Sequence, residues 1–324
     1  MNKDWKTKLQ EEVQPEYFFW AAVCLSLFFL MEPHGAALQN EVAAAAVGAT
    51  TPESIKENPF DSVELTAKAA YVYDLKAKRP LFSKNALEPL PLASITKIMT
   101  AATALSYIPE TTYITIGMDA IAEEGDSGLK VGERWILRDL LKFMLLESSN
   151  DGAAAVSGAV GEILATSTQT SEQDRALFVE KMNGLGEALG LRSTYFLNES
   201  GLDIDTEHAG AYSSAAETAR MLAYALEAFP AVFAETRLSE LSLQSEEGEE
   251  HAALNTNKGT NDLPLLIASK TGYTDLAGGN LVIAFDAGFN RPVIIAVLGS
   301  TEEERFTDVE KLVWSTLEYL AQAR

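Results

Sequence analysis

Cysteine, histidine and positive charge are all scarce in this chain of 324 residues. Cys24 is the only cysteine, which excludes a disulfide within the chain and a metal site built from several thiolates. His208 and His251 do not stand at a spacing typical of metal ligands, so a zinc hydrolase is not expected. Lysine and arginine number 25 against 47 aspartates and glutamates, for a net charge of −22. Because like charges repel, this excess argues against nucleic acid or an anionic membrane surface as the main partner.

One long hydrophobic run is present, at residues 17–31, where fifteen residues carry no charge. Lysines precede it and small residues follow it. The run is shorter than the ~20 residues of a transmembrane helix and close to a signal-peptide core of ~7–15 residues. Residues 1–31 are therefore expected to be a signal peptide or a signal anchor. This predicts export to an extracytoplasmic location, with attachment to the cytoplasmic membrane through residues 17–31 if the segment is not cleaved.

Composition divides the remainder of the chain into two parts. Residues 32–62 are rich in Ala, Gly, Pro, Thr and Glu without an apolar period, which predicts a linker. Residues 63–324 are expected to form one folded domain. Its sheet part is expected at about 63–90 and 237–324, and its helical part at about 91–236.

Hydrophobic periodicity predicts the elements of this domain. Strands are expected at 69–74, from 81, and at 265–270, 280–285 and 292–298. Helices are expected at 94–107, 135–146, 153–164, 171–190, 213–228 and 308–323. This order predicts an α/β chain of the α+β type, with an antiparallel five-stranded sheet flanked by helices and an inserted helical subdomain. The acidic run Glu246–Glu250 predicts a solvated loop.

Three short polar motifs occur in the order Ser94-Ile-Thr-Lys97, Ser148-Ser-Asn150 and Lys270-Thr-Gly272. A Ser followed three residues later by a Lys is expected about once by chance in a chain of this length. Here the first motif begins a predicted helix, the second follows an apolar helical run, and the third lies in a strand pattern. Together they supply a nucleophile, a base, a polar relay and a cation, which suffice for acyl transfer without histidine, metal or cofactor.

Ser94 and Lys97 have the spacing of a nucleophile and its base. A serine hydroxyl is a poor nucleophile until a base takes its proton, and positions three apart share one helix face. Lys97 can act as a base only when neutral, and burial or a second cation lowers a lysine pKa. Lys270 is the candidate for that cation. The backbone N–H of Ser94, near a helix N-terminus, is suited to a developing oxyanion.

The other two motifs suit substrate binding. An ammonium beside a hydroxyl, as in Lys270 and Thr271, suits a substrate carboxylate, and Gly272 permits close approach of another backbone. Ser148 and Asn150 follow an apolar helix, where they can relay a proton to a leaving amine and hold an amide. Asp151 is expected to cap the Ala-rich helix that follows.

Serine β-lactamases and penicillin-binding proteins share this set of motifs. With its flanks, the chain resembles the low-molecular-weight penicillin-binding proteins, which are D-alanyl-D-alanine carboxypeptidases and D,D-endopeptidases of the serine type. The resemblance covers about Thr66 to the C-terminus. It rests on the three motifs and on the segments Ala69–Asp74, Pro91–Ala101, Gly128–Gly132, Phe196–Leu202 and Lys270–Gly278. It implies a β-lactamase-like fold in which residues 63–324 are the D,D-peptidase domain.

The resemblance implies hydrolysis of peptidoglycan stem peptides through an acyl-enzyme, with β-lactams as inhibitors. Ser94 would attack the D-Ala-D-Ala carbonyl, Lys97 would take its proton, and Ser148 would help to protonate the departing D-Ala. The other implied roles are binding of the substrate backbone by Asn150, binding of the terminal carboxylate at Lys270, Thr271 and Gly272, and an oxyanion hole formed by the backbone N–H groups of Ser94 and Tyr273. Many members add a β-rich domain and a C-terminal anchor, whereas this chain ends after its closing helix, so membrane attachment is expected from its N-terminus.

Three alternative functions share these motifs. Ser269 precedes Lys270 where many carboxypeptidases have Gly and an apolar residue, which leans toward a D,D-endopeptidase that cleaves cross-links. A β-lactamase of the common class needs a Glu four residues before an Asn, and Thr194 holds that place relative to Asn198. A non-catalytic sensor of β-lactams or muropeptides would be acylated once, but the short cytoplasmic portion leaves no room for a signalling domain.

Overall fold

The computed structural model describes residues 57–322. The predicted signal segment, Cys24 and most of the predicted linker lie outside the described residues. Within the described part of the chain, no helix combines the length and the apolar character that crossing a membrane requires. The end of the predicted linker packs on the domain, because Phe60 is buried with its ring centroid 5.3 Å from that of Phe82 and 5.7 Å from that of Tyr319.

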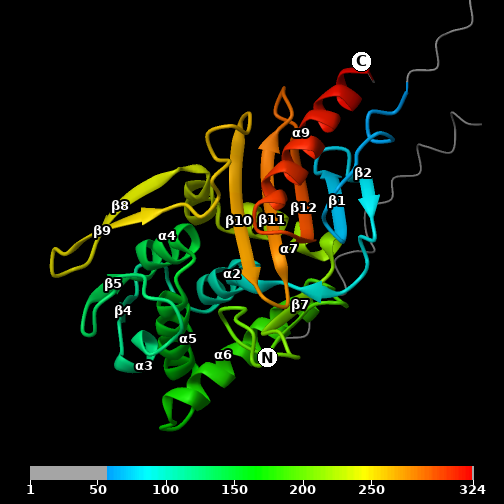
Figure 1. Ribbon diagram of the computed structural model, residues 1–324. Helices are drawn as coiled ribbons and strands as arrows, with labels where there is room; N and C mark the ends of the chain where they lie inside the picture. The colour runs from blue at the N-terminus through cyan, green and yellow to red at the C-terminus, as the bar shows by residue number, and fades with distance from the viewer. Residues whose placement is uncertain (1–56, 323–324) are drawn as a thin grey trace, which may run out of the picture. The chain divides into compact units, whose positions relative to one another are not determined.

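Five antiparallel strands form the main sheet (Figure 1). Their spatial order is β10 (Leu266–Thr274), β11 (Gly278–Asp286), β12 (Pro292–Ser300), β1 (Ala69–Asp74) and β2 (Arg79–Lys84). β1 pairs with β12, with Ala69 opposite Leu298, so the beginning and the end of the domain meet within one sheet. The predicted five-stranded antiparallel sheet is confirmed. β10 lies at the edge of this sheet, where half of its backbone groups lack a strand partner.

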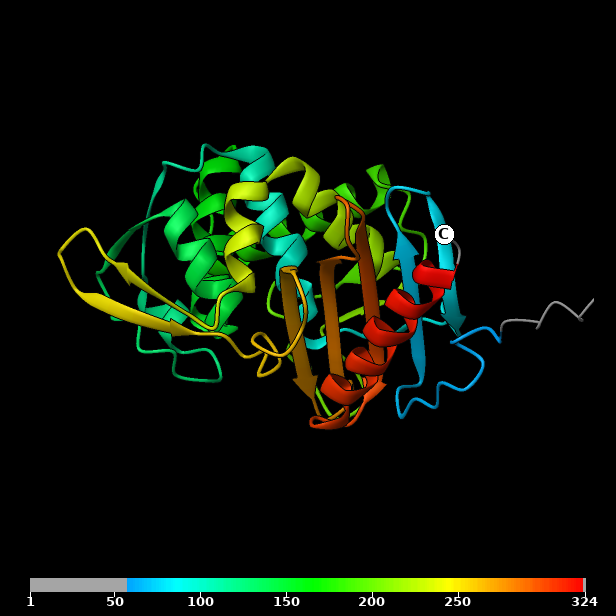
Figure 2. The same cartoon turned by 90° about the horizontal axis from the view of Figure 1, so that it is seen from above.

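Both faces of the sheet are covered (Figure 2). α9 (Glu304–Gln322) packs on one face, and α7 (Ala215–Ala228) with the rest of the helical region packs on the other. A hydrophobic core lies on each face of the sheet. Strand β12 contributes side chains to both cores, because successive side chains of a strand point to opposite faces. Val293, Ile295 and Val297 join the core beneath α9. Ile294, Ala296 and Leu298 join the core shared with the helices.

The helical part lies between β2 and β10 in the sequence. Its elements are η2 (Ala93–Thr96), α2 (Lys97–Tyr107), α3 (Met118–Ile121), α4 (Leu137–Glu147), α5 (Asn150–Leu164), α6 (Ser171–Ala188), α7, α8 (Pro230–Phe233) and η3 (Ala234–Arg237). Helix α2 is buried from Lys97 to Ala104 and runs through the middle of this region. Pro230 follows the end of α7, as predicted, and also begins α8.

The Ala-rich helix α5 begins earlier than predicted, at Asn150 rather than 153. Its N-cap is Ser149, whose hydroxyl accepts the N–H of Gly152 at 2.8 Å. The prediction that Asp151 caps this helix is wrong. Asp151 lies within the first turn, and its carboxylate instead accepts the backbone N–H of Ser127 at 3.2 Å and the Ser127 hydroxyl at 2.9 Å.

Three small sheets were not predicted. They consist of β3 (Leu90–Pro91) with β7 (Ala211–Ser213) and β6 (Tyr195–Phe196), of β4 (Tyr113–Thr115) with β5 (Arg134–Ile136), and of β8 (Glu240–Gln244) with β9 (Glu250–Leu254). The acidic run predicted as a solvated loop is the tip of the β8–β9 hairpin. Glu246 and Glu249 there form ion pairs with Arg134 at 2.7 Å and Lys130 at 3.0 Å, so the tip is tied to the helical part.

Candidate active site

The chain approaches Ser94 along a tightly held backbone. The buried amide of Asn280 on β11 donates to the carbonyls of Pro91 at 2.9 Å and Leu92 at 3.0 Å. Ala93 then adopts a left-handed backbone, with φ of +49°, directly before Ser94. Such a conformation is strained for a residue with a Cβ, and strain of this kind concentrates at functional sites.

Gly272 is where strand β10 meets this turn. A Cβ built on Gly272 would lie 2.7 Å from the Leu92 carbonyl oxygen and 3.1 Å from the Ser94 nitrogen. Only glycine therefore lets β10 approach the turn that holds the hydroxyl. The Gly272 carbonyl accepts a hydrogen bond from Arg305 Nη1 at 2.9 Å, which fixes β10 from its other side.

Lys97 lies directly beneath Ser94 and is fully buried. Its Nζ is 2.9 Å from Ser94 Oγ, 2.7 Å from Asn150 Oδ1 and 2.9 Å from the Ser200 carbonyl oxygen. Burial lowers the pKa of Lys97 from its ordinary value of 10.5 to about 7, against the opposing pull of the Glu199 and Glu123 carboxylates. A large share of the amine is then neutral near pH 7 and can accept the Ser94 proton.

Lys270 is 2% exposed and faces the second motif. Its Nζ donates to Ser148 Oγ at 2.9 Å and to the Thr271 carbonyl at 2.9 Å. Burial, followed by the charges of Lys97 and Arg305, holds the pKa of Lys270 well below its ordinary value of 10.5. The sequence suggested Lys270 as the cation that lowers the pKa of Lys97, but burial is the cause there, and it is the charge of Lys97 that helps to lower the pKa of Lys270.

Ser148 and Asn150 flank the junction of α4 and α5. Ser148 ends α4 in a left-handed conformation, with φ of +63°, and its hydroxyl accepts from Lys270. Both polar ends of the Asn150 side chain are engaged. Its oxygen accepts from Lys97, and its Nδ2 donates to the Glu124 carbonyl at 2.7 Å. In this structure Asn150 therefore orients Lys97, a contact that the expected role in substrate binding did not include.

Thr271 and Tyr273 complete the predicted residues along β10. The Thr271 hydroxyl is buried and hydrogen-bonds to the Thr256 hydroxyl. Tyr273 is 47% exposed, at the open side of the strand. The geometry thus brings all eight predicted site residues to one place, where the turn before α2, the α4–α5 junction and β10 meet: Ser94, Lys97, Ser148, Asn150, Lys270, Thr271, Gly272 and Tyr273.

Sequence reasoning missed several residues that hold this site. Ser200 contributes a backbone carbonyl, and Asn280 and Thr256 hold neighbouring backbone and side-chain groups. A carbonyl acceptor has no residue-type signal, although Ser200 lies inside the segment Phe196–Leu202 that resembled the family. Among the described residues, no group of three or more histidine, cysteine, aspartate or glutamate side chains is arranged to hold a metal ion.

Comparison with known proteins identifies a family for this chain. Residues 53–302 match the family model described as D-alanyl-D-alanine carboxypeptidase. The carboxypeptidase DacF of Bacillus subtilis is 27% identical over 253 residues, covering 76% of this chain and 61% of that protein. The carboxypeptidase DacB2 of Mycobacterium tuberculosis is 30% identical over 240 residues, covering 73% of this chain and 76% of that protein.

Solved structures share the fold. Penicillin-binding protein D2 from Listeria monocytogenes, in its cefotaxime-bound form, is 26% identical with a TM-score of 0.64, covering 78% of this chain and 98% of that one. The Streptomyces K15 DD-transpeptidase has a TM-score of 0.70 at 24% identity, covering 79% and 98%, a likeness that shows the fold alone.

Fold and motifs define the class of serine enzymes to which the penicillin-binding proteins and β-lactamases belong. Within that class, this chain belongs to the D-alanyl-D-alanine carboxypeptidase family. The predicted family and fold are confirmed. The chain spans 61% and 62% of the length of two curated relatives that it matches, DacF of Bacillus subtilis and DacC of Escherichia coli.

Proposed function

We propose that this protein is a serine-type D-Ala-D-Ala carboxypeptidase that acts on peptidoglycan stem peptides through an acyl-enzyme. One observation carries the proposal: a fully buried lysine amine, with a pKa lowered to about 7, lies 2.9 Å from the hydroxyl of Ser94. Family membership supports the substrate class. The proposed enzyme domain is residues 63–324, following a signal peptide or anchor at 1–31 and a linker at 32–62.

In the first step, neutral Lys97 takes the Ser94 proton as Oγ attacks the carbonyl carbon of the penultimate D-Ala. The backbone N–H groups of Ser94 and Tyr273 would bind the oxygen that becomes negative. The strand edge at β10 supports this role because alternate N–H groups of an edge strand have no partner within the sheet.

In the second step, the C–N bond breaks and the terminal D-Ala leaves as an amine. Ser148 supplies the proton, since its hydroxyl accepts from Lys270 and so has its own proton to donate. Lys97, which now carries the proton from Ser94, would then return a proton to Ser148. Water then attacks the acyl-enzyme with Lys97 as base, which releases the shortened peptide and restores the Ser94 hydroxyl.

The terminal carboxylate of the substrate would bind at Lys270, Thr271 and Gly272. Before binding, burial and nearby cations disfavour the charged form of Lys270. An arriving carboxylate favours that charged form, so the binding site gains its full positive charge when the substrate is present. A β-lactam, which also presents a carboxylate beside a reactive carbonyl, would acylate Ser94 in the same way. Such a substrate places the protein outside the cytoplasm, and residues 17–31 would attach it to the membrane if they are retained.

The alternatives gain no specific support from the site. Ser269, which leaned toward cross-link cleavage, is buried and donates its hydroxyl to the Thr236 carbonyl at 3.0 Å, so it faces η3 rather than the substrate. Thr194, at the place of the β-lactamase glutamate, hydrogen-bonds to Glu217 at 2.6 Å and Ser213 at 2.7 Å.

Release of D-Ala from a stem pentapeptide tests this proposal. The parent and Ser106→Ala, whose hydroxyl lies on α2 and bonds the Ala102 carbonyl at 2.7 Å, are expected to release D-Ala at similar rates. Ser94→Ala is expected to release none. Cleavage of cross-linked dimers alone would make the protein an endopeptidase, rapid penicillin hydrolysis would make it a β-lactamase, and acylation without turnover would make it a sensor.

A further inference from the structure

Two acceptors hold the Lys97 amine beside Ser94, and they belong to separate parts of the chain. One is Asn150 Oδ1 and the other is the Ser200 carbonyl oxygen. The Asn150 side chain is itself held from behind by the Glu124 carbonyl. The position of the base therefore depends on two loops, residues 122–129 after α3 and residues 197–202 after β6.

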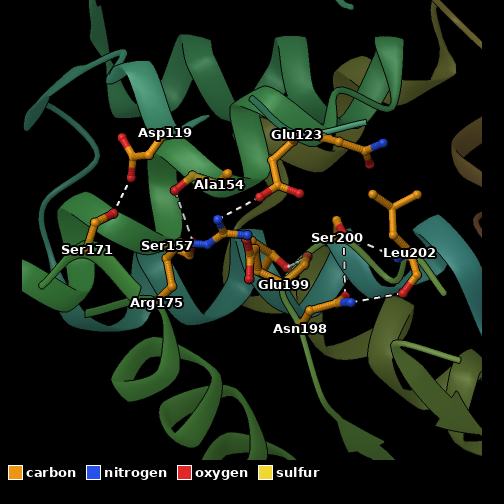
Figure 3. A network of polar contacts seen from close by, with 12 residues as sticks. Asp119, Glu123, Ala154, Ser157, Ser171, Arg175, Asn198, Glu199, Ser200 and Leu202 are labelled. Atoms are coloured by element: carbon orange, nitrogen blue, oxygen red, sulfur yellow. Dashed lines mark hydrogen bonds and ion pairs between the residues drawn. The ribbon is translucent and has the colours of Figure 1, made fainter. Parts of the chain in front are cut away.

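Arg175, on α6, links these two loops (Figure 3). Its Nη1 lies 2.6 Å from Glu123 Oε1, and its Nη2 lies 2.6 Å from Glu199 Oε1. Glu199 is only 2% exposed, while the side chains of Arg175 and Glu123 are about a quarter exposed, at 25% and 23%. Both contacts are ion pairs, and a planar guanidinium can face two carboxylates at once, which a lysine ammonium does with less geometric control.

Each carboxylate that Arg175 binds is adjacent in sequence to a carbonyl that sets the position of Lys97. Glu123 precedes Glu124, whose carbonyl holds Asn150, and Glu199 precedes Ser200, whose carbonyl holds the amine directly. The contacts therefore form a closed ring. It runs from Lys97 through Asn150 and the 123–124 backbone to Arg175, and returns through Glu199 and Ser200. The Glu199 carbonyl also accepts the Thr100 hydroxyl at 2.6 Å, which joins this ring to α2.

We propose that Arg175 is a positioning residue for the proposed acylation: by bridging Glu123 and Glu199 it holds both acceptors that keep the Lys97 amine against the Ser94 hydroxyl. The inference rests on the proposed function. Arg175 touches neither Ser94 nor the substrate-binding strand, so it acts only through the two loops. Displacement of a catalytic group by about 1 Å can slow a reaction by about 100-fold, so loss of the bridge has a measurable effect on rate.

The same ring sets the charge that Lys97 faces. The Glu199 and Glu123 carboxylates favour its charged form, and Arg175 lies between them as their counter-charge. The charge of Lys97 in turn lowers the pKa of Lys270, on β10. Removing only the guanidinium leaves two uncompensated carboxylates, whereas removing one carboxylate leaves a single, balanced carboxylate–guanidinium pair. The two changes must shift the pH dependence of acylation in opposite directions.

Acylation by a chromogenic cephalosporin, measured from pH 5 to pH 9, tests the inference. Arg175→Gln is expected to slow acylation by about 10- to 100-fold. It should also shift the rising limb of the pH–rate profile to higher pH. Glu199→Gln is expected to slow acylation and to shift the rising limb of the pH–rate profile to lower pH. Arg175→Lys should restore the pH at which the acylation rate rises, but only part of the rate itself. Lys181→Gln, on the same helix and paired with neighbouring Glu180 at 3.5 Å, is the control and should match the parent.

If Arg175 has a purely structural role, its loss would reduce the amount of active protein, as measured by titration with penicillin. It would leave unchanged the pH at which the acylation rate rises. That result, or a parent-like rate and limb for Arg175→Gln, would overturn the inference. If Arg175→Gln does not fold, Glu123→Gln breaks the bridge at its more exposed end, and a parent-like rate there would overturn it equally. A parent protein that no β-lactam acylates would instead overturn the proposed function.

Discussion

Lys270 Nζ lies 2.9 Å from Ser148 Oγ, so the edge strand β10 and the end of α4 share a hydrogen bond across the candidate site. This contact joins two proposed roles, because the amine that would bind the substrate carboxylate also orients the hydroxyl that would protonate the leaving group. Ser148 has a left-handed backbone where α4 ends, and its hydroxyl there meets Lys270.

Ser148→Ala is expected to lower the acylation rate constant by about 10²- to 10⁴-fold, the usual contribution of a positioned proton donor. The KM for a stem peptide should change little, because Lys270 and Thr271 remain to bind its carboxylate. Steady-state kinetics of D-Ala release separates the two constants. Ser157→Ala, whose hydroxyl bonds the Ala154 carbonyl at 3.0 Å within α5, is the matched control. A raised KM with unchanged kcat would assign Ser148 to binding instead.

Gly272→Ala should displace the turn that holds Ser94, because its Cβ would lie 2.7 Å from the Leu92 carbonyl oxygen. We expect a loss of about 1–3 kcal/mol in the free energy of unfolding together with slower acylation. Gly184→Ala is the control, since a Cβ on this glycine of α6 meets nothing within 4 Å. It should gain about 0.5–1 kcal/mol by helix propensity. Denaturant unfolding of both variants measures the difference, and equal stabilities would contradict the close approach.

The acylation rate of the parent should rise with pH through about 7 and then level off, because only neutral Lys97 can accept the Ser94 proton. Stopped-flow acylation by a chromogenic cephalosporin across pH 5 to pH 9 measures this limb. A rate that is flat over this range, or that rises only near the ordinary lysine pKa of 10.5, would mean that Lys97 is not the base.

Lys97 should also cost stability in a pH-dependent way. Its folded pKa of about 7 is below the ordinary value of 10.5 that applies to the unfolded chain. Below pH 7 both states are protonated and the folded state bears a buried charge, so the cost is full there. Between pH 7 and 10.5 the folded amine is neutral, and the cost falls as pH rises. Lys97→Met should therefore raise the Tm most at pH 6 and least near pH 10, and a pH-independent difference would contradict burial as the cause.

Much of the site could be predicted because its side chains stand in three short motifs whose chemistry is legible from residue type. The residue types and spacing of Ser94, Lys97 and Lys270 are enough to propose a nucleophile, a base and a cation. The strands β11 and β12 were also predictable, since unbroken apolar runs without helix caps favour buried strands. The sequence named burial and a second cation as possible causes of a lowered Lys97 pKa but could not decide between them, because burial depends on packing between α2 and segments more than fifty residues away.

Other features had no sequence signal strong enough to find. The β8–β9 hairpin mixes alanine and glutamate with few β-branched residues, so its propensity favours other structures, and tertiary contacts decide it. Ser149 and Asp151 are both good N-cap residues, and only the αL turn at Ser148 selects the former. The Arg175 bridge joins residues from three elements, and no spacing along the chain indicates it.

The mass of the protein after incubation with benzylpenicillin, followed by peptide mapping, tests the acyl-enzyme mechanism most directly. We predict one adduct per chain, located at Ser94, and none in Ser94→Ala, while Ser106→Ala is modified like the parent. An adduct at another residue, or none on the folded parent protein, would contradict the assignment of Ser94 and Lys97 as nucleophile and base.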